Sequence, residues 1–326
     1  MITAPAASGD TDTVARGSER SVATAQPDCL QHLIRLGCDG RYVRAVVQPL
    51  GQPARSPVPI FDDILCGVDG TRRSYEAVRQ AAVLAEPGAR LTLVAVTAVR
   101  GEGTQRTAAI APERARRALA HARRVALAAG IEEVTVDIDD GAPVTERLLA
   151  RAHDHHLLAI GAPAMSRIAH ILVGGTATEA AHLLPASVLL VRRPLARVTF
   201  GERILVASDG SHRSEGLVDF AAEFARQRGA SLVLVHAFHG ETGAQPTAIA
   251  RQVERVTAAL GEEAAVRIKR GSPRNLILST AEMEHCSLII VASRRLSGLR
   301  ALGSLSERLV HDARCSVLVM RPEDVG

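Results

Sequence analysis

The 326-residue sequence contains no tryptophan, and aromatic residues make up only 2% of it. Any hydrophobic core must therefore be built from Val, Leu, Ile and Ala. The formal net charge of +4 is small for this length, and the basic residues are spread along the chain. Together with the shortage of aromatic rings for base stacking, this charge argues against a nucleic-acid-binding protein.

Paired cysteines and long apolar runs are also missing. The five cysteines are odd in number and form no CxxC pair, which argues against a disulfide framework and for a reducing cytoplasm. No uninterrupted apolar stretch is long enough to cross a bilayer, and residues 1–26 lack the apolar run of a secretory signal. We therefore expect a cytoplasmic protein that is neither exported nor embedded in a membrane.

The chain contains an internal repeat. Residues 64–71 (ILCGVDGT) and 204–211 (ILVASDGS) share one plan, an apolar run closed by Asp-Gly and a hydroxyl residue. Each run reads as a buried strand that stops at a turn, and a stretch with helical spacing follows it. In the first copy this helical pattern is expected to end at Pro87-Gly88, with the next strand starting at Arg90.

Five apolar strands alternate with helical stretches in each copy, as expected for a parallel sheet covered on both faces. We predict an α/β protein of two tandem doubly wound domains, each with a five-stranded parallel sheet in flavodoxin-like or Rossmann-like order. Residues 58–196 are assigned to domain 1 and residues 200–323 to domain 2.

Residues 1–57 precede the repeat as an N-terminal tail. Its first part has the composition of a disordered segment, and we expect removal of residues 1–27 to leave the melting temperature nearly unchanged. Within the tail, residues 30–36 favour a short amphipathic helix and residues 43–50 favour a strand.

A ligand of such a sheet is expected beyond the carboxyl ends of the strands, between the first and fourth strands, where the strand order reverses. In domain 1 these ends carry Asp69-Gly70-Thr71 and the segment that starts at Gly161. Residues 161–178 read GAPAMSRIAHILVGGTAT. In domain 2 the corresponding stretch, residues 292–307, reads ASRRLSGLRALGSLSE.

These motifs resemble the universal stress protein family, over residues 59–321. Members that bind ATP carry an Asp after the first strand. After the fourth strand they carry Gly, two residues, Gly, nine residues, and then Gly followed by Ser or Thr. Domain 1 departs from this pattern at two positions. Ala164 stands at the second glycine, and Gly175 stands at the hydroxyl position, unless Thr176 serves there. Domain 2 keeps the final Gly-Ser but has Ala292 and Arg295 for the first two glycines, in a loop two residues shorter.

The resemblance implies an adenine nucleotide, ATP, bound mainly by domain 1. Glycines let backbone N–H groups approach phosphate oxygens, and a helix that begins beyond them adds unpaired N–H groups. Asp69 lies where a ribose hydroxyl or a magnesium ion would be found. The candidate binding residues are Asp69, Gly70, Thr71, Gly161, Ala164, Gly174, Gly175 and Thr176 in domain 1, and Asp209, Gly303, Ser304 and Ser306 in domain 2.

Motifs for catalysis and metal binding are not found. The sequence has no GxSxG, P-loop, HExxH or GxGxxG motif, so no catalytic residue is assigned. The cluster His153-Asp154-His155-His156 is interpreted as a solvated connection rather than a metal site, because no partner has ligand spacing. The arginines between residues 114 and 124 are interpreted as a solvated helix face, with an acidic partner as the alternative.

These observations lead to one functional hypothesis and two rivals. The first is a non-enzymatic, ATP-binding regulatory protein of the stress response, which acts by nucleotide-dependent conformation or by binding an unidentified protein. The second is a dimerising scaffold that binds no nucleotide, and the third is a slow ATPase. Because an apolar edge strand is normally covered, we also expect residues 188–191 and 317–320 to pair the two domains about a pseudo-twofold axis, with homodimer formation left open.

Overall fold

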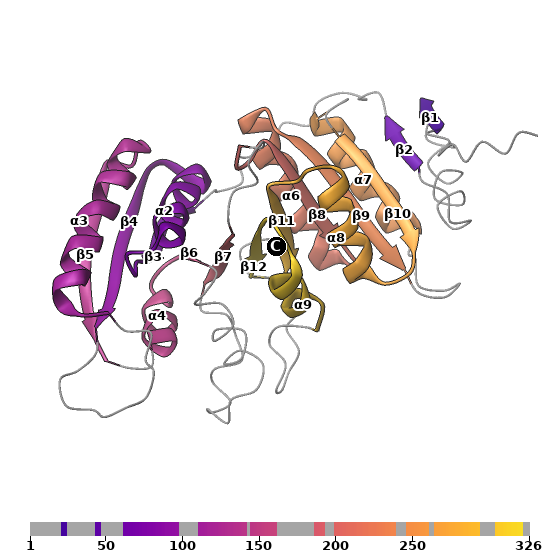
Figure 1. The fold of residues 1–326 in the computed structure, drawn as a ribbon. Helices are drawn as coiled ribbons and strands as arrows, with labels where there is room; N and C mark the ends of the chain where they lie inside the picture. Colours follow the sequence, from indigo (N-terminus) through magenta and orange to yellow (C-terminus); the bar gives the residue numbers. More distant parts are fainter. Residues whose placement is uncertain are drawn as a thin grey trace, which may run out of the picture.

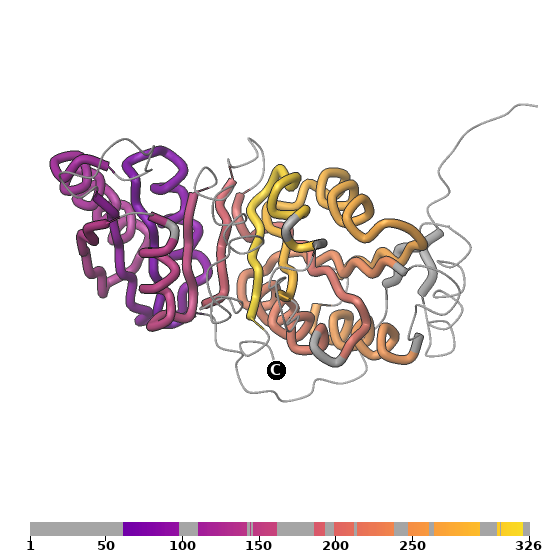
Figure 2. Tube along the Cα trace, turned by 90° about the horizontal axis from the view of Figure 1, so that it is seen from below, coloured from indigo at the N-terminus to yellow at the C-terminus, as the bar shows by residue number. Residues whose placement is uncertain are grey.

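The structure is a computed structural model that describes residues 21–24, 43–46, 61–97, 110–141, 144–161, 186–192, 199–238, 246–260, 264–293 and 304–321. Within these residues, ten strands form one continuous sheet, and two short strands of the tail form a second sheet (Figure 1). The larger sheet spans both domains, which lie side by side along it (Figure 2).

Domain 1 alternates strands and helices as the repeat predicts. Its elements are β3 (Phe61–Gly67), α2 (Arg72–Leu84), β4 (Ala85–Thr97), α3 (Pro112–Ala128), β5 (Glu133–Asp140), α4 (Val144–Ala152), β6 (Leu157–Gly161) and β7 (Ser187–Val191). Thr71 caps α2, because its hydroxyl accepts a hydrogen bond from the N–H of Ser74 at 3.3 Å.

Domain 2 repeats this arrangement. Its elements are β8 (Arg203–Ser208), α6 (His212–Arg228), β9 (Ser231–Phe238), α7 (Pro246–Leu260), β10 (Ala264–Arg270), α8 (Pro273–Met283), β11 (Leu288–Ala292), α9 (Ser304–Asp312) and β12 (Ser316–Met320). Helix α6 ends at Gly229, whose φ of 62° is left-handed and costs glycine little.

One predicted boundary is wrong. The helix in domain 1 was expected to run to Pro87-Gly88, but α2 ends at Leu84 and β4 already begins at Ala85. A residue that precedes proline is pushed towards extended backbone, so Glu86 cannot belong to a helix that stops at Pro87. The chain therefore turns extended earlier, and Ala85 pairs with Phe61 across a register shift.

When the five strands of each domain are numbered along the chain, their order across the sheet is 3-2-1-4-5. The predicted doubly wound sheet is therefore confirmed. The fifth strands, β7 and β12, lie next to each other and pair antiparallel, with Leu189 opposite Leu318. This pairing confirms that the two apolar edges cover each other. Because the pair is antiparallel, the carboxyl ends of the strands of domain 1 and domain 2 lie at opposite edges of the sheet.

Two reciprocal hydrogen bonds flank the β7–β12 pair and show its pseudo-twofold symmetry. The N–H of Arg192 donates to the Ser316 hydroxyl at 3.1 Å, and the N–H of Arg321 donates to the Ser187 hydroxyl at 3.0 Å. The Ser316 hydroxyl also donates to the Gln80 amide oxygen at 2.7 Å, which ties β12 to α2 of the other domain.

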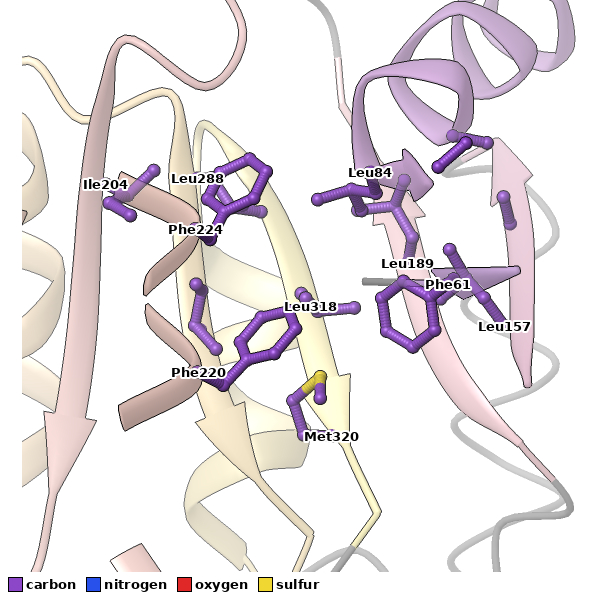
Figure 3. Close-up of a cluster of buried hydrophobic side chains, with 14 of the residues drawn as sticks. Phe61, Leu84, Leu157, Leu189, Ile204, Phe220, Phe224, Leu288, Leu318 and Met320 are labelled. Atoms are coloured by element: carbon purple, nitrogen blue, oxygen red, sulfur yellow. The ribbon is translucent and has the colours of Figure 1, made fainter. Parts of the chain in front are cut away.

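The hydrophobic core is continuous across the two domains. One face of the sheet is covered by α2, α3, α6 and α7, and the other face by α4, α8 and α9. On the first face, the rings of Phe61 and Phe220 approach to 6.0 Å between centroids, and Phe220 contacts Phe224. Figure 3 shows Leu189 on β7 beside Phe61, and Leu318 on β12 beside Phe220.

The described part of the tail consists of β1 (Ser21–Thr24) and β2 (Val43–Val46), which pair in parallel. Strand β2 falls within the predicted strand, β1 was not predicted, and β2 contacts β10, the edge strand of domain 2. The expected helix at residues 30–36 lies outside the described residues. The effect of removing residues 1–27 stays a prediction.

We expect Phe220→Ala to lower the free energy of unfolding by about 3–5 kcal/mol, the usual cost of removing a buried aromatic ring. Phe220 is 1% exposed and fills the core between the two domains. Urea denaturation followed by circular dichroism measures the change. Met283→Ala is the control, because Met283 is 56% exposed and its removal should change stability by less than about 0.5 kcal/mol. Equal effects of the two substitutions would contradict the burial of Phe220 in the hydrophobic core.

Candidate functional site

The carboxyl ends of the first and fourth strands form the candidate site in each domain. In domain 1, β3 lies between β4 and β6, and in domain 2, β8 lies between β9 and β11. The crossovers lead away from this point on both sides, so a crevice is expected outside the strand ends. The structure thus places the Asp-Gly turns of both repeats at the predicted switch point.

Asp69 organises the turn between β3 and α2. Its Oδ1 accepts hydrogen bonds from the N–H of Thr71 at 2.8 Å and from the Thr71 hydroxyl at 2.7 Å. Neither bond uses Oδ2, which leaves that oxygen as an acceptor for a ligand. Asp69 and Thr71 are partly buried, so the carboxylate is fixed in direction while one side stays open to solvent.

Gly70 brings this turn against helix α3. Its φ is +78°, and a Cβ on it would lie 3.3 Å from the Cβ of Ala118 and 3.5 Å from the Nε of Arg114. The guanidinium of Arg114 therefore stands beside the turn. Burial and then the charge of Asp69 raise the pKa of Tyr75, while Arg114 lowers it, so all three groups share one electrostatic environment.

Gly161 closes the site from the end of β6. A Cβ at this position would lie 3.0 Å from the carbonyl carbon of Arg73 and 3.1 Å from the N of Ser74. Only glycine lets the end of β6 approach the first turn of α2 this closely. Since Ser74 is also bonded to Thr71, Gly161 and the Asp69 turn meet at the start of one helix.

Three arginines near this edge were not assigned to the site from the sequence, which placed Arg114 on a solvated helix face. Arg73 lies against Gly161, Arg114 against Gly70, and Arg192 directly follows β7, the neighbour of β6. Burial and then the positive charge of Arg73 lower the pKa of Arg192. For Arg192 the sequence offered one signal, since both fifth strands are followed by Arg-Pro or Arg-Arg-Pro.

Part of the predicted site cannot be placed. Ala164, Gly174, Gly175 and Thr176 lie outside the described residues, as does Gly303 of domain 2. The structure brings together Asp69, Gly70, Thr71 and Gly161, and the role of the remaining loop stays a prediction.

The turn of domain 2 repeats the geometry but not the surroundings. Asp209 Oδ1 accepts from the N–H of Ser211 at 3.0 Å and from its hydroxyl at 2.6 Å. Gly210 has a φ of +76°, and a Cβ there would lie 3.0 Å from Ile249 and 3.7 Å from the ring of His236. The turn of domain 2 therefore faces an apolar side chain and an imidazole, where domain 1 presents an arginine.

A buried polar network lies behind the Asp209 turn. The Ser208 hydroxyl contacts Gln252 Oε1 and accepts the N–H of Gly210 at 3.0 Å, while Gln252 donates to the Ser214 hydroxyl at 3.1 Å. His236 Nδ1 lies 2.9 Å from the carbonyl oxygen of Ser208. Burial lowers the pKa of His236, and the contact with the Ser208 carbonyl and the charge of Asp209 oppose this shift. The sequence pattern did not identify this network, because Gln252 and His236 lie far from Ser208 in the chain.

The end of β11 and the start of α9 form the other side of the site in domain 2. Ala292 occupies the position of Gly161, since both are the last residues of the fourth strand. The hydroxyl of Ser306 donates to the carbonyl oxygen of Ala292 at 3.3 Å. Ser304 begins α9, and its side chain lies outside the described residues.

The histidine cluster forms the connection between α4 and β6 that the sequence suggested, and His153, Asp154 and His156 are exposed to solvent. His155 Nδ1 lies 2.6 Å from Asp63 Oδ1, and His156 pairs with Asp62, so both imidazoles contact the start of β3. Their carboxylate partners were missed because they precede the histidines by about ninety residues. Among the described residues, no group of three or more His, Cys, Asp and Glu side chains could hold a metal ion.

No helix in the described part of the chain is long and apolar enough to cross a membrane. Arg73 lies against Gly161 and Arg114 lies beside Gly70, next to the N-terminus of α2, whose dipole favours an anion. The residues present in domain 1 therefore fit a phosphate-containing ligand.

Comparison with known proteins agrees with this architecture. The chain is 28% identical over 145 residues to the universal stress protein YxiE of Bacillus subtilis, covering 36% of this chain and 98% of that protein. It is 31% identical over 134 residues to a universal stress protein of Thermus aquaticus, covering 36% of this chain and 97% of that protein. A universal stress protein structure from Archaeoglobus fulgidus has a TM-score of 0.61 and 23% identity, covering 79% of this chain and 95% of that one. The universal stress protein family model matches twice, at residues 61–192 and 201–321, and the chain therefore belongs to the universal stress protein family with two tandem domains.

Proposed function

We propose that this chain is a regulatory protein of the stress response that binds ATP, mainly through domain 1. It acts by nucleotide-dependent conformation or by binding a protein partner, rather than by catalysis. The observation that carries the proposal is the meeting of Gly161, the Asp69 turn and the first turn of α2 at the switch point of the sheet.

Charge supports a phosphate-containing ligand in domain 1. Arg73, Arg114 and Arg192 surround the carboxyl edge of the domain 1 strands, and the N-terminus of α2 adds a favourable dipole. The Asp69 carboxylate would repel phosphate, so its free oxygen fits a ribose hydroxyl or a magnesium ion that accompanies the nucleotide. In this proposal the arginines and backbone N–H groups bind the phosphates, and Asp69 binds the sugar or the ion.

Domain 2 is the weaker site in this proposal. Ala292 carries a methyl group where Gly161 lies against α2, and Gly210 faces Ile249 rather than an arginine. Arg295 replaces the second glycine of the family motif, although Arg294 or Arg295 can in part compensate as a charged phosphate donor. Both domains keep the Asp turn, so domain 2 retains a means of holding a sugar hydroxyl.

The first test separates the two sites by their aspartates. We expect Asp69→Ala to raise the Kd for ATP by about 10-fold or more, the cost of a lost hydrogen bond to a charged group. We expect Asp209→Ala to raise the Kd of the stronger site less than about 10-fold. Isothermal titration of MgATP into each full-length variant measures both values.

Asp69→Asn is the matched control, because an amide oxygen can still accept from Thr71 while the negative charge is lost. A Kd close to that of Asp69→Ala would assign the effect to the charge, and a Kd close to that of the parent chain would assign it to the turn. If Asp209→Ala removes most binding and Asp69→Ala little, domain 2 holds the working site. If the parent chain binds no ATP, the scaffold hypothesis replaces this proposal.

The second test uses the close approach at Gly161. We expect Gly161→Ala to push the end of β6 away from α2, at a cost of about 1–3 kcal/mol for overpacking. The displacement of the Asp69 turn should weaken ATP binding by about 10-fold, because about 1.4 kcal/mol corresponds to each factor of ten. Ala292→Gly makes the opposite change in domain 2 and leaves Gly161 and the Asp69 turn in place, so it should not weaken ATP binding by domain 1. Full ATP affinity in Gly161→Ala, at an unchanged melting temperature, would contradict the assigned site.

A further inference from the structure

Arg192 belongs to domain 1 but reaches into domain 2. It directly follows β7, and its N–H bonds the Ser316 hydroxyl at the start of β12, as described above. Its guanidinium donates from Nη2 to the carbonyl oxygens of Val310 and of His311, the latter at 2.9 Å. Arg192 thus contacts both the strand and the helix that precedes it.

The two carbonyls that Arg192 binds are in the last turn of α9. The last four carbonyl groups of a helix have no partner within the helix, and the dipole makes this end negative. A guanidinium satisfies both requirements at once, since it supplies fixed N–H donors and a positive charge. Arg192 therefore serves as a C-terminal cap of α9 that is contributed by the other domain.

Helix α9 extends from one edge of the sheet to the other. At its first turn, the Ser306 hydroxyl bonds the last residue of β11, at the carboxyl edge of domain 2. Its last turn lies beside the start of β12, which is level with the carboxyl end of β7 because the two strands are antiparallel. Nine residues of helix cover about 13 Å along this path. The helix thus joins the candidate phosphate site of domain 2 to the arginine-rich edge of domain 1.

We propose that Arg192 couples the two nucleotide sites through α9, so that each site strengthens the other. This inference rests on the nucleotide binding proposed above. A helix as short as α9 is marginal by itself, so an anion at its N-terminus and Arg192 at its C-terminus stabilise the same element. The ordered helix in turn holds the Arg192 guanidinium at the carboxyl end of β7, where its positive charge and that of Arg73 attract an anionic nucleotide to domain 1. Linkage makes this effect reciprocal.

The first measurement is the exchange of backbone amides in α9 without any nucleotide. We expect Arg192→Ala to speed hydrogen–deuterium exchange in residues 304–312, and Arg192→Lys to restore part of the protection. Arg228→Ala is the matched control, because Arg228 also crosses between the domains, donating to the carbonyl oxygen of Val83 at the far end of α2. It should leave α9 unchanged. Equal exchange in the parent chain and in Arg192→Ala would overturn the proposal.

The second measurement is a titration cycle with MgATP on full-length chains. In the parent chain, weakening domain 2 by Asp209→Ala should raise the Kd of domain 1 about fivefold, the lower end of typical coupling. In the Arg192→Ala background the same change should have no effect on domain 1, whereas in Arg228→Ala the fivefold effect should remain.

The outcomes separate the two proposals. If domain 1 binds MgATP with an affinity that Asp209→Ala does not change, the coupling is wrong and the proposed function stands. If coupling persists in Arg192→Ala, it does not run through this residue and the inference is likewise wrong. If the parent chain binds no MgATP, both the proposed function and the coupling fail.

Discussion

The antiparallel pairing of β7 and β12 is the contact on which the rest of the structure depends. Each domain ends its sheet in a fully buried apolar strand, Ser187–Val191 or Ser316–Met320, which would be an exposed edge in a separate domain. Pairing removes both edges at once and joins ten strands into one sheet. It also places Phe220 against Phe61, so that one core serves both domains. The opposed direction of the strands then puts the two candidate sites at opposite edges, with α9 between them.

The two domains share one backbone arrangement but differ in the groups of side chains that contact one another at equivalent positions. In domain 1, Tyr75 packs edge-on against His121, with 4.4 Å between ring centroids. In domain 2, Glu215 stands at the equivalent point of its first helix and bonds Arg251 and Arg255 instead. An aromatic contact on one side corresponds to an ion-pair network on the other, so each interaction is complete within its own domain. The candidate sites differ in the same way, with Arg114 beside the turn of domain 1 and Ile249 and the His236 ring beside the turn of domain 2.

Much of the fold could be predicted from local pattern. Continuous apolar runs such as Leu157–Gly161 indicate buried parallel strands, and their repetition fixed the number of domains. The start of β4 was misplaced because two influences compete there, helical spacing up to Ala85 and the restriction that Pro87 places on Glu86. Local propensity alone does not decide between them, whereas pairing of Ala85 with Phe61 does.

The candidate site was predictable in its turns and in Gly161 at the end of the fourth strand. Asp-Gly followed by a hydroxyl residue is a local signal, and the structure places Asp69 and Asp209 accordingly. Arg192 and the partners of His155 were missed because their contacts join segments more than ninety residues apart, and nothing in a single sequence reports such pairs. The packing of Gly161 against Arg73 is also a contact between distant segments. The sequence shows the glycine but not the close approach that requires it.

Native mass spectrometry of the chain purified without added nucleotide tests the central claim most directly. The account predicts an adenine nucleotide bound to the parent chain, retained in Asp209→Ala and lost in Asp69→Ala. Repeatedly empty preparations that also fail to take up ATP, or a bound nucleotide that Asp69→Ala does not remove, would contradict it.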